Sequence, residues 1–353
     1  DGDGDGCTPK EETCNNADDD CDLQIDEDVT PTENDCNQRG VCAGTTPLCV
    51  AGEAVCRYGD AFENDETLCD GEDNDCDGAT DEGIEGLGDD CSEGVGACKT
   101  TGTLVCNALG NGVRCDVEVP DPSDEVCDGL DNDCDGLVDE PKDPVDGRGS
   151  NPSYVQDDVV AIDGGSLYVY RYEAARPDAT DEQAGASNKR ACSRAGVMPW
   201  TNVTYEEAEA ACDAANMRLC TEAEWVDICN GAGNDCTWSY VSGDSSCASS
   251  LPDKGCNGHD PSAAPGEADN DALAVTGSLE NCYSPHGAEG VFDLSGNAKE
   301  WTTGSGGTGQ PVRGGAYNDL SGGLECGATF ARANEAVRLQ SIGFRCCSTT
   351  DPR

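Results

Sequence analysis

The sequence has few basic residues, and this sets its charge. Only 20 Lys and Arg stand against 72 Asp and Glu in 353 residues, which gives a formal net charge of −52. Nucleic acids and anionic membrane surfaces are bound through clustered Lys and Arg, so we expect neither as a partner. No stretch of 18 apolar residues is present, so we expect no membrane insertion through a hydrophobic helix. No signal segment precedes the acidic start, and we expect the chain to be a processed piece of a longer precursor.

Aromatic residues are scarce in the first 150 residues, which contain Tyr58 and Phe62 but no Trp. The same stretch has 43 acidic and 7 basic residues, a net charge of −36, whereas the remaining 203 residues have 29 and 13, a net of −16. A segment with so little apolar surface cannot bury a large core, and its charges repel one another. We therefore predict an elongated, loop-rich segment that disulfides and bound cations stabilise.

Histidine is also scarce, with two residues, and no Cys-x-x-Cys pair occurs among the 26 cysteines. Zinc sites usually combine such pairs with His, so we interpret the cysteines as disulfide-bonded. Disulfides persist in oxidising compartments, which predicts an extracellular or cell-surface location. Residues 1–150 contain 15 cysteines and the rest contain 11. Because both counts are odd, either one bridge links the two parts or Cys7 pairs with a segment further upstream.

Three segments of the N-terminal part repeat one another: CNNADDDCDLQIDE from Cys14, CDGEDNDCDGATDE from Cys69 and CDGLDNDCDGLVDE from Cys127. Each has two cysteines separated by six residues, a D-x-D-x-D pattern across the second cysteine, and a closing Asp-Glu pair. Cysteine-rich stretches separate them, which is typical of a repeat array. The predicted organisation is multidomain: a partial repeat at 1–35, two Cys-rich repeats at 36–90 and 91–145, a linker at 146–156 and a C-terminal domain at 157–353.

The spacing of the acids in each repeat suits Ca²⁺, which takes six to eight oxygen ligands at about 2.3–2.6 Å. Acids at positions 1, 3 and 5 of a loop can wrap one ion, and Gly at position 6 permits the sharp turn. Leu23 replaces that Gly in the first repeat, where we expect a weaker or distorted site. The alternative is that the acids form a solvated charged face. The predicted calcium ligands are Asp18, Asp20, Asp22, Asp26 and Glu27 in the first loop, Asp73, Asp75, Asp77, Asp81 and Glu82 in the second, and Asp131, Asp133, Asp135, Asp139 and Glu140 in the third.

A fourth acidic stretch, DGDGDGCTPKEE, places Asp1, Asp3, Asp5 and Glu12 at EF-hand-like positions. No helical pattern flanks it, so a calcium site and a frayed terminus both stay open. The array resembles the metal-binding repeats of the MopE type, found in secreted bacterial multidomain proteins, over about residues 1–141. The closely spaced acids of the array are also similar to those of thrombospondin type 3 calcium repeats. The residues and the resemblance together predict several bound Ca²⁺ ions.

The composition changes from about residue 157, and all four tryptophans lie in this later part. The stretch 167–170 has the β-favouring residues of a strand. Thr204 with Glu207, and Thr221 with Glu224, have the spacing of capping boxes, which predicts two helix starts. The sequence after the second helix is rich in Gly, Ser and Asn, which predicts long loops.

Four motifs of this part occur in order: MRLCTEAEW (217–225), GVFDLSGNAKEWT (290–302), VRGGAY (312–317) and IGFRCC (342–347). Over about residues 157–347 they resemble the formylglycine-generating, sulfatase-modifying factor family. The resemblance implies a C-type-lectin-like α+β fold with two helices, a small twisted sheet and many loops. It also implies that Asn297 and Glu300 help to bind calcium.

Catalytic members of this family use two cysteines that bind copper(I) and oxidise a substrate cysteine to formylglycine. The matching positions here are Asp319 and Leu324, and the nearby Cys326 is a single thiol, too few for a two-cysteine site. We expect Cys326 to belong to a structural disulfide and the domain to be non-catalytic. We also expect the adjacent Cys346 and Cys347 to bond to separate partners.

These features favour a calcium-binding structural or adhesive protein that is secreted or displayed at the cell surface. It would be one subunit of an extracellular filament or other assembly, with copies of itself, other surface proteins or glycans as partners. The main alternative is a lectin-like receptor that binds glycan or peptide through the loops around 240–285. An active oxidase is less favoured because the cysteine pair is missing. A copper-binding surface protein is less favoured because hard carboxylates select calcium over copper.

Overall fold

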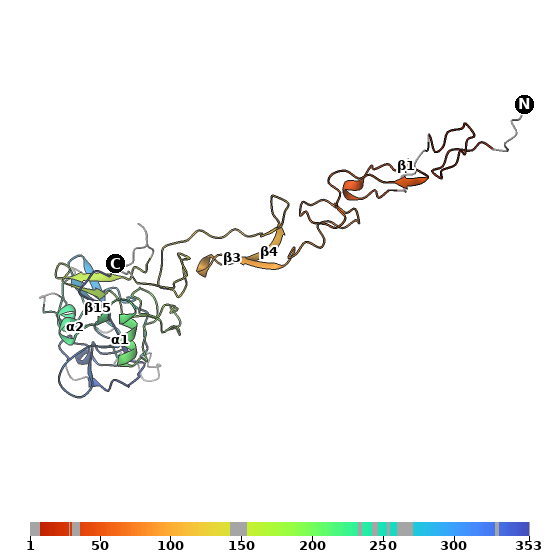
Figure 1. The fold of residues 1–353 in the computed structure, drawn as a ribbon. Coiled ribbons are helices and arrows are strands. Elements are labelled where there is room, and N and C mark those ends of the chain that lie inside the picture. Colours follow the sequence, from red (N-terminus) through yellow and green to blue (C-terminus); the bar gives the residue numbers. More distant parts are fainter. Residues whose placement is uncertain are drawn as a thin grey trace, which may run out of the picture. The chain divides into compact units, whose positions relative to one another are not determined.

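The fold is known from a computed structural model (Figure 1). It describes residues 8–27, 29, 36–141, 154–231, 235–241, 246–252, 255–259, 271–328 and 332–352. The chain divides into two compact units. The first consists of Asp1–Gly94 with Lys99–Pro120, and the second consists of Val95–Cys98 with Asp121–Arg353. The third acidic loop therefore belongs to the same compact unit as the C-terminal part of the chain.

The first unit has little regular structure and is built from short antiparallel strands. Its paired strands are β1 (Leu48–Val50) with β2 (Glu53–Val55), and β3 (Asp90–Glu93), β4 (Thr100–Cys106) and β5 (Val113–Cys115) in that order in one sheet. A single 3₁₀ turn, η2 (Gly40–Cys42), precedes β1. Few apolar side chains other than cysteines are buried here, as the composition predicts.

Disulfides in the repeats follow one pattern. The first cysteine of a loop bonds forward to the next cysteine-rich stretch, as in Cys14–Cys49 and Cys69–Cys106. The second cysteine bonds backward, as in Cys42–Cys76 of the first unit and Cys98–Cys134 of the second. Two further bridges close the stretches themselves, Cys36–Cys56 and Cys91–Cys115. The second and third loops are thus tied to the chain on both sides, which replaces the missing apolar core.

The described part of the second unit is mostly β, with two α-helices. One four-stranded sheet has the order β6-β7-β15-β8 with antiparallel pairs, and a second has the order β13-β12-β11-β14, in which β11 and β14 are parallel. The strands of these sheets are β6 (Val159–Ile162), β7 (Leu167–Tyr170), β8 (Arg218–Leu219), β11 (Lys299–Trp301), β12 (Gln310–Arg313), β13 (Arg332–Ala333), β14 (Ile342–Phe344) and β15 (Cys346–Ser348). The remaining elements are the hairpin β9 (Tyr283–His286) with β10 (Glu289–Phe292) and the 3₁₀ turns η3 (Gly96–Cys98) and η4 (Ser321–Gly323).

The two helices begin where the capping boxes predict. Helix α1 (Tyr205–Asp213) starts after Thr204 and helix α2 (Glu222–Cys229) starts after Thr221 (Figure 1). In each, the threonine side chain accepts from the N–H of the third helical residue, whose glutamate accepts from the threonine N–H. Two N–H groups of the first turn are thereby satisfied, which fixes both starts.

The core of the second unit lies around its tryptophans. Trp200, Trp225, Trp301 and Phe344 are all at most 2 % exposed. The indole N–H of Trp301 donates to the carbonyl of Val203 at 3.0 Å. Burial of these large side chains supplies the apolar packing that the first unit lacks.

Disulfides of the second unit confirm three expectations from the sequence. Cys346 and Cys347 bond to separate partners, and Cys326 belongs to a disulfide. One bridge links the repeat array to the C-terminal part, which was one of the two alternatives that the odd counts left open. The bonds are Cys127–Cys192, Cys212–Cys346, Cys220–Cys347, Cys229–Cys326, Cys236–Cys247 and Cys256–Cys282. Cys7 lies outside the described residues.

None of the helices in the described residues is both long and apolar enough to cross a membrane.

Candidate metal centres

The first acid of each D-x-D-x-D motif closes its loop. Asp131 accepts a hydrogen bond from the N–H of Asp135 at 3.1 Å on one carboxylate oxygen and from that of Gly136 at 3.0 Å on the other. The equivalent bonds run from Asp22 and Leu23 to Asp18, and from Gly78 to Asp73. The same short-range bonds therefore wind all three loops in the same way.

The residue after the fifth position has a left-handed backbone in every loop. Its φ is 99° at Gly78, 95° at Gly136 and 74° at Leu23. Glycine takes this conformation freely, whereas leucine incurs a cost of about 1–2 kcal/mol. Leu23 makes the same hydrogen bond as the glycines of the other loops, so the backbone of the first loop shows no distortion. Weaker calcium binding at this loop stays a prediction.

The three D-x-D-x-D acids of the first loop lie close together. Asp18, Asp20 and Asp22 each offer a carboxylate oxygen, and these oxygens lie within 4.8 Å of one another. In every loop the acids at positions 3 and 5 also accept a hydrogen bond from the N–H two residues further on, which fixes their side chains. These bonds run from Asp22 to Asp20, Gln24 to Asp22, Asp77 to Asp75, Ala79 to Asp77, Asp135 to Asp133 and Leu137 to Asp135.

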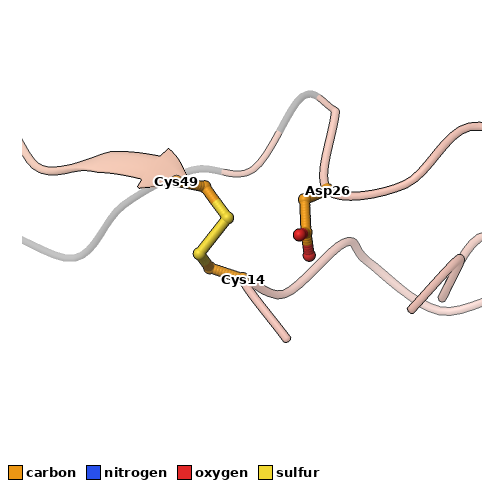
Figure 2. A group of neighbouring side chains, drawn as sticks. All are labelled: Cys14, Asp26 and Cys49. Atoms are coloured by element: carbon orange, nitrogen blue, oxygen red, sulfur yellow. A yellow bond between two sulfur atoms is a disulfide. The ribbon is translucent and has the colours of Figure 1, made fainter. Parts of the chain in front are cut away.

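The aspartate eight residues after the first acid of each motif, at position 9, accepts hydrogen bonds from the N–H groups at the opposite end of the loop. Asp26 accepts from the N–H of Asn15 at 2.8 Å and of Asn16 at 3.0 Å, and it lies beside the Cys14–Cys49 disulfide (Figure 2). Asp81 and Asp139 make the equivalent bonds, from Gly71 to Asp81, and from Asp128 and Gly129 to Asp139. The structure thus gives these three aspartates a loop-closing contact, and their predicted role as calcium ligands stays a prediction.

The closing glutamate of the third loop is the best-defined candidate ligand. Both carboxylate oxygens of Glu140 are buried and have no hydrogen-bond donor among the described residues. Burial raises the pKa of Glu140, and the neighbouring charges of Glu125, Asp135 and Asp133 raise it further. A carboxylate buried among other carboxylates without a donor is what a cation site requires. Glu82 has one such oxygen and Glu27 has two in the equivalent positions.

A second glutamate, which the sequence reasoning did not single out, stands before the first cysteine of each repeat. Glu125 accepts from the N–H groups of Asn132 at 2.6 Å, Asp133 at 2.9 Å and Asp139 at 3.3 Å, so that it joins the start and the end of the third loop. Its signal in the sequence is a glutamate two or three residues before that cysteine, in the segments ETC, ETLC and EVC.

Glu12 and Glu66 are the counterparts of Glu125 in the other two loops. Glu12 accepts from the N–H groups of Asp19 and Asp20, both at 2.8 Å, and of Asp26 at 3.1 Å. Glu66 accepts from Asn74 at 2.5 Å. The EF-hand-like interpretation of the stretch DGDGDGCTPKEE makes Glu12 the last ligand of a separate calcium loop. Its partners Asp1, Asp3 and Asp5 lie outside the described residues, and Glu12 itself belongs to the first repeat loop.

The third loop is anchored to the rest of the second unit. Arg190 is 3 % exposed, donates to the carbonyl of Asp139 at 2.8 Å and forms a buried ion pair with Asp157. The N–H of Val155 donates to the carbonyl of Glu140 at 3.0 Å. With the Cys127–Cys192 bond, these contacts anchor the end of the loop.

Asn297 and Glu300 lie in separate networks. The carboxylate of Glu300 is fully buried, pairs with Arg345 at 2.8 Å and accepts from the indole N–H of Trp225 at 2.7 Å. Asn297 donates to Glu173 at 2.5 Å. Arg345 already neutralises Glu300, so a calcium ion at Glu300 would have to displace a buried guanidinium. Calcium binding by this pair stays a prediction that rests on the resemblance.

The two positions that match the family's catalytic cysteines have other contacts. Asp319 forms an ion pair with Lys299 and accepts from the N–H of Ala316 at 2.8 Å. Leu324 is 2 % exposed. The nearby Cys326 is bonded to Cys229 in the interior. These side chains offer no thiol to copper at this place in the described structure.

A cavity of about 780 Å³ lies at the start of α2. Its walls include the ion pair of Glu222 with Arg313, and also Asp227, Thr303 and Ser305. Such a mixture of both charges and hydroxyl groups suits a small polar ligand.

The fold defines a mostly β, disulfide-rich domain with two short helices, preceded by acidic loops. The family model described as the sulfatase-modifying factor enzyme 1-like domain matches residues 150–350, more than half of the chain. The chain belongs to this family. No curated protein matches it.

Several solved structures are similar to part of the chain. Variable protein 1 of Treponema denticola is 14 % identical, with a TM-score of 0.36, over 55 % of this chain and 91 % of that one. PvdO from Pseudomonas aeruginosa is 17 % identical, with a TM-score of 0.35, over 51 % and 79 %. CarF is 16 % identical, with a TM-score of 0.33, over 51 % and 85 %. At these scores the similarities support no functional argument.

Proposed function

We propose that the chain is a secreted calcium-binding structural or adhesive surface protein, and that its family domain is a non-catalytic part of it. The observation that carries this proposal is the buried carboxylate of Glu140, which has no donor among the described residues and faces other acids. An unpaired buried charge is costly, and a cation among the carboxylates removes that cost.

The choice of calcium follows from the donor set. The loops offer carboxylate oxygens, and their cysteines are bonded in disulfides and offer no thiolate. Hard oxygen donors in a flexible loop suit Ca²⁺, while Mg²⁺ demands a tighter octahedron and copper prefers softer ligands. The loops therefore favour calcium as the resident ion.

Disulfides support a role outside the cytosol. Every cysteine of the described residues is oxidised, including those that frame the acidic loops. Calcium is abundant in extracellular fluids, where modules with weak affinity are still filled. An array that folds with bound calcium is suited to hold or present the family domain in an assembly of copies or of other surface proteins.

The non-catalytic assignment rests on the positions of Asp319 and Leu324. If the family's copper cysteines belong there, this chain has an ion pair and a buried leucine instead. The remaining thiol, Cys326, is bonded to Cys229. Incubation with copper(I) and a cysteine-containing peptide should give no formylglycine, and a measured conversion would contradict this part of the proposal.

Calcium removal tests the structural role. We expect EGTA to lower the melting temperature of the full chain and to make the loops accessible to proteases, with recovery on addition of Ca²⁺ but not of Mg²⁺. Asp131→Asn should reduce this effect, whereas Glu118→Gln, at an exposed acid outside the loops, should not. Equal stability and equal protease resistance with and without EGTA would contradict the proposal. Electron microscopy of the calcium-loaded protein then reports whether copies assemble.

The cavity near α2 favours a second candidate function, a receptor for a glycan or peptide. Glu222, Arg313 and the hydroxyl groups beside them can bind a polar ligand in a cavity of about 780 Å³. This differs from the loops around 240–285 that the sequence suggested, of which residues 242–245, 253–254 and 260–270 lie outside the described residues. Binding on a glycan or peptide array that Arg313→Met abolishes would support the receptor, and an array without any binding would count against it.

A further inference from the structure

We propose that each acidic loop binds two divalent cations that share one aspartate, with the glutamate before the first cysteine as a ligand of the second cation. This inference rests on the proposed calcium function and adds a second site to it. The first site is made by the D-x-D-x-D acids. The second is made by the upstream glutamate, the middle aspartate and the closing glutamate.

The first loop shows both sites. Oxygens of Asp18, Asp20 and Asp22 lie within 4.8 Å of one another, and so do oxygens of Glu12, Asp20 and Glu27. Asp20 belongs to both groups. A carboxylate has two oxygens and can bridge two calcium ions, so the shared aspartate is where two neighbouring sites would meet.

The second loop shows that its upstream glutamate has an oxygen left for a cation. Glu66 is 8 % exposed, and one of its oxygens accepts from the N–H of Asn74. Its other oxygen is buried and has no hydrogen-bond donor among the described residues. One oxygen of Glu82, the closing glutamate of the same loop, is buried without a donor as well. Two such oxygens in one loop are costly to bury as charges, and a cation beside them would remove that cost.

The third loop repeats the arrangement in a more buried setting. Glu125 is 3 % exposed, and the charges of Glu125 and Asp133 raise the pKa of Glu140. These are the counterparts of Glu12, Asp20 and Glu27. In the second loop Glu66 and Asp75 likewise raise the pKa of Glu82, so the three acids that lie together in the first loop also interact in the other two.

The upstream glutamate can bind a cation while it holds the backbone. Each oxygen of a carboxylate has two lone pairs, and Oε2 of Glu12 accepts a single N–H bond, from Asp26, so it can still bind an ion. The N–H bonds fix the glutamate against the loop, and in the first loop an oxygen of Glu12 lies within 4.8 Å of an oxygen of Glu27. The same contacts that stabilise the loop therefore prepare the second site.

The charge of each loop also calls for a second ion. The five acids of the two sites carry a formal charge of −5, and one Ca²⁺ leaves −3, whereas two leave −1. A residual charge of −3 within a few ångströms would repel itself strongly at low dielectric. A second divalent cation removes most of this repulsion.

Native mass spectrometry of the full chain with Ca²⁺ tests the inference by counting ions. Glu12→Gln, Glu66→Gln and Glu125→Gln remove the charge, and Glu118→Gln is the matched control. The one acceptor oxygen of glutamine is enough for the single N–H bond at Glu66. Glu12→Gln and Glu125→Gln also lose the bond from the N–H of Asp26 or Asp139, which the second carboxylate oxygen accepts. We expect each single variant to lose one ion, the triple variant to lose three, and the control to lose none.

Three results would overturn the inference. An unchanged count in the single variants would show that the glutamate is not a ligand, and a loss of two ions per variant would show that it is only a scaffold for the first site. One ion per loop in the unsubstituted chain would remove the second site and leave the calcium function standing. No bound calcium at all would refute the proposed function itself.

Discussion

The clearest test of the C-terminal unit is the substitution Glu300→Gln. The carboxylate of Glu300 accepts from two nitrogens of Arg345, at 2.8 Å from Nη2 and 3.1 Å from Nε, and from the indole of Trp225 at 2.7 Å. A glutamine keeps one acceptor oxygen but turns an NH₂ group toward these donors. It also leaves the guanidinium of Arg345, which is fully buried, without its counter-charge.

The expected loss of stability is large. Removal of one partner from a buried ion pair costs about 3–5 kcal/mol, because the other charge stays buried and unpaired. For a unit of this size that corresponds to a drop in melting temperature of roughly 6–20 °C. The ion pair of Arg171 with Glu289 is part-exposed, and its loss should cost less than about 1 kcal/mol.

Tryptophan fluorescence is a suitable assay, because all four tryptophans belong to the second unit. Denaturant unfolding would be followed for the unsubstituted chain, for Glu300→Gln and for Glu289→Gln as the control, each in Ca²⁺ and in EGTA. The ion pair predicts that Glu300→Gln is destabilised by a similar amount in both solutions.

A calcium dependence would refute this reasoning. If Glu300 were a calcium ligand, as the family resemblance implies, the substitution would weaken the unit only while calcium is bound. Equal stability of Glu300→Gln and the unsubstituted chain in EGTA would therefore show that Arg345 is not its essential partner.

Three further predictions concern the same unit. Arg190→Met leaves Asp157 buried without its partner, so we expect a loss of about 3–5 kcal/mol in unfolding and a lower affinity of the third loop in a calcium titration. The pair of substitutions Cys127→Ser and Cys192→Ser opens a loop of 65 residues, which should cost up to about 4 kcal/mol in the same assay, and an unchanged midpoint would contradict it. Burial raises the pKa of Asp293 to about 6 from 3.8, so its contribution to stability is present below pH 4 and is lost as pH rises through 6. Asp293→Asn should flatten stability between pH 4 and 6, by about 3 kcal/mol, and an unaltered pH profile would refute this assignment.

The sequence predicts those parts of the structure that depend on near neighbours along the chain. The capping boxes place both helix starts because Thr204 and Glu207, or Thr221 and Glu224, meet within a single turn. The winding of the acidic loops also follows from bonds that span two to five residues. The resemblance placed the family domain where the family model matches it.

Contacts between distant residues could not be predicted in this way. Glu125 meets Asp139 across the loop, Arg190 meets Asp139 across 51 residues, and Arg345 meets Glu300 across 45. Each of these pairings depends on how the chain is packed. For the same reason the cysteine counts left open whether one bridge joins the two parts, and only the fold showed that Cys127 bonds to Cys192.

The sequence by itself determined that this chain is acidic, disulfide-rich and repeated, and which carboxylates lie on each loop, because spacing along the backbone fixes short-range geometry. Tertiary structure decided which of those carboxylates are braced by N–H groups and which are buried without a donor. It also decided that the third loop is part of the C-terminal unit. These properties depend on burial and on partners far away in the sequence, which hydrogen bonding, charge and packing select only when the chain is folded.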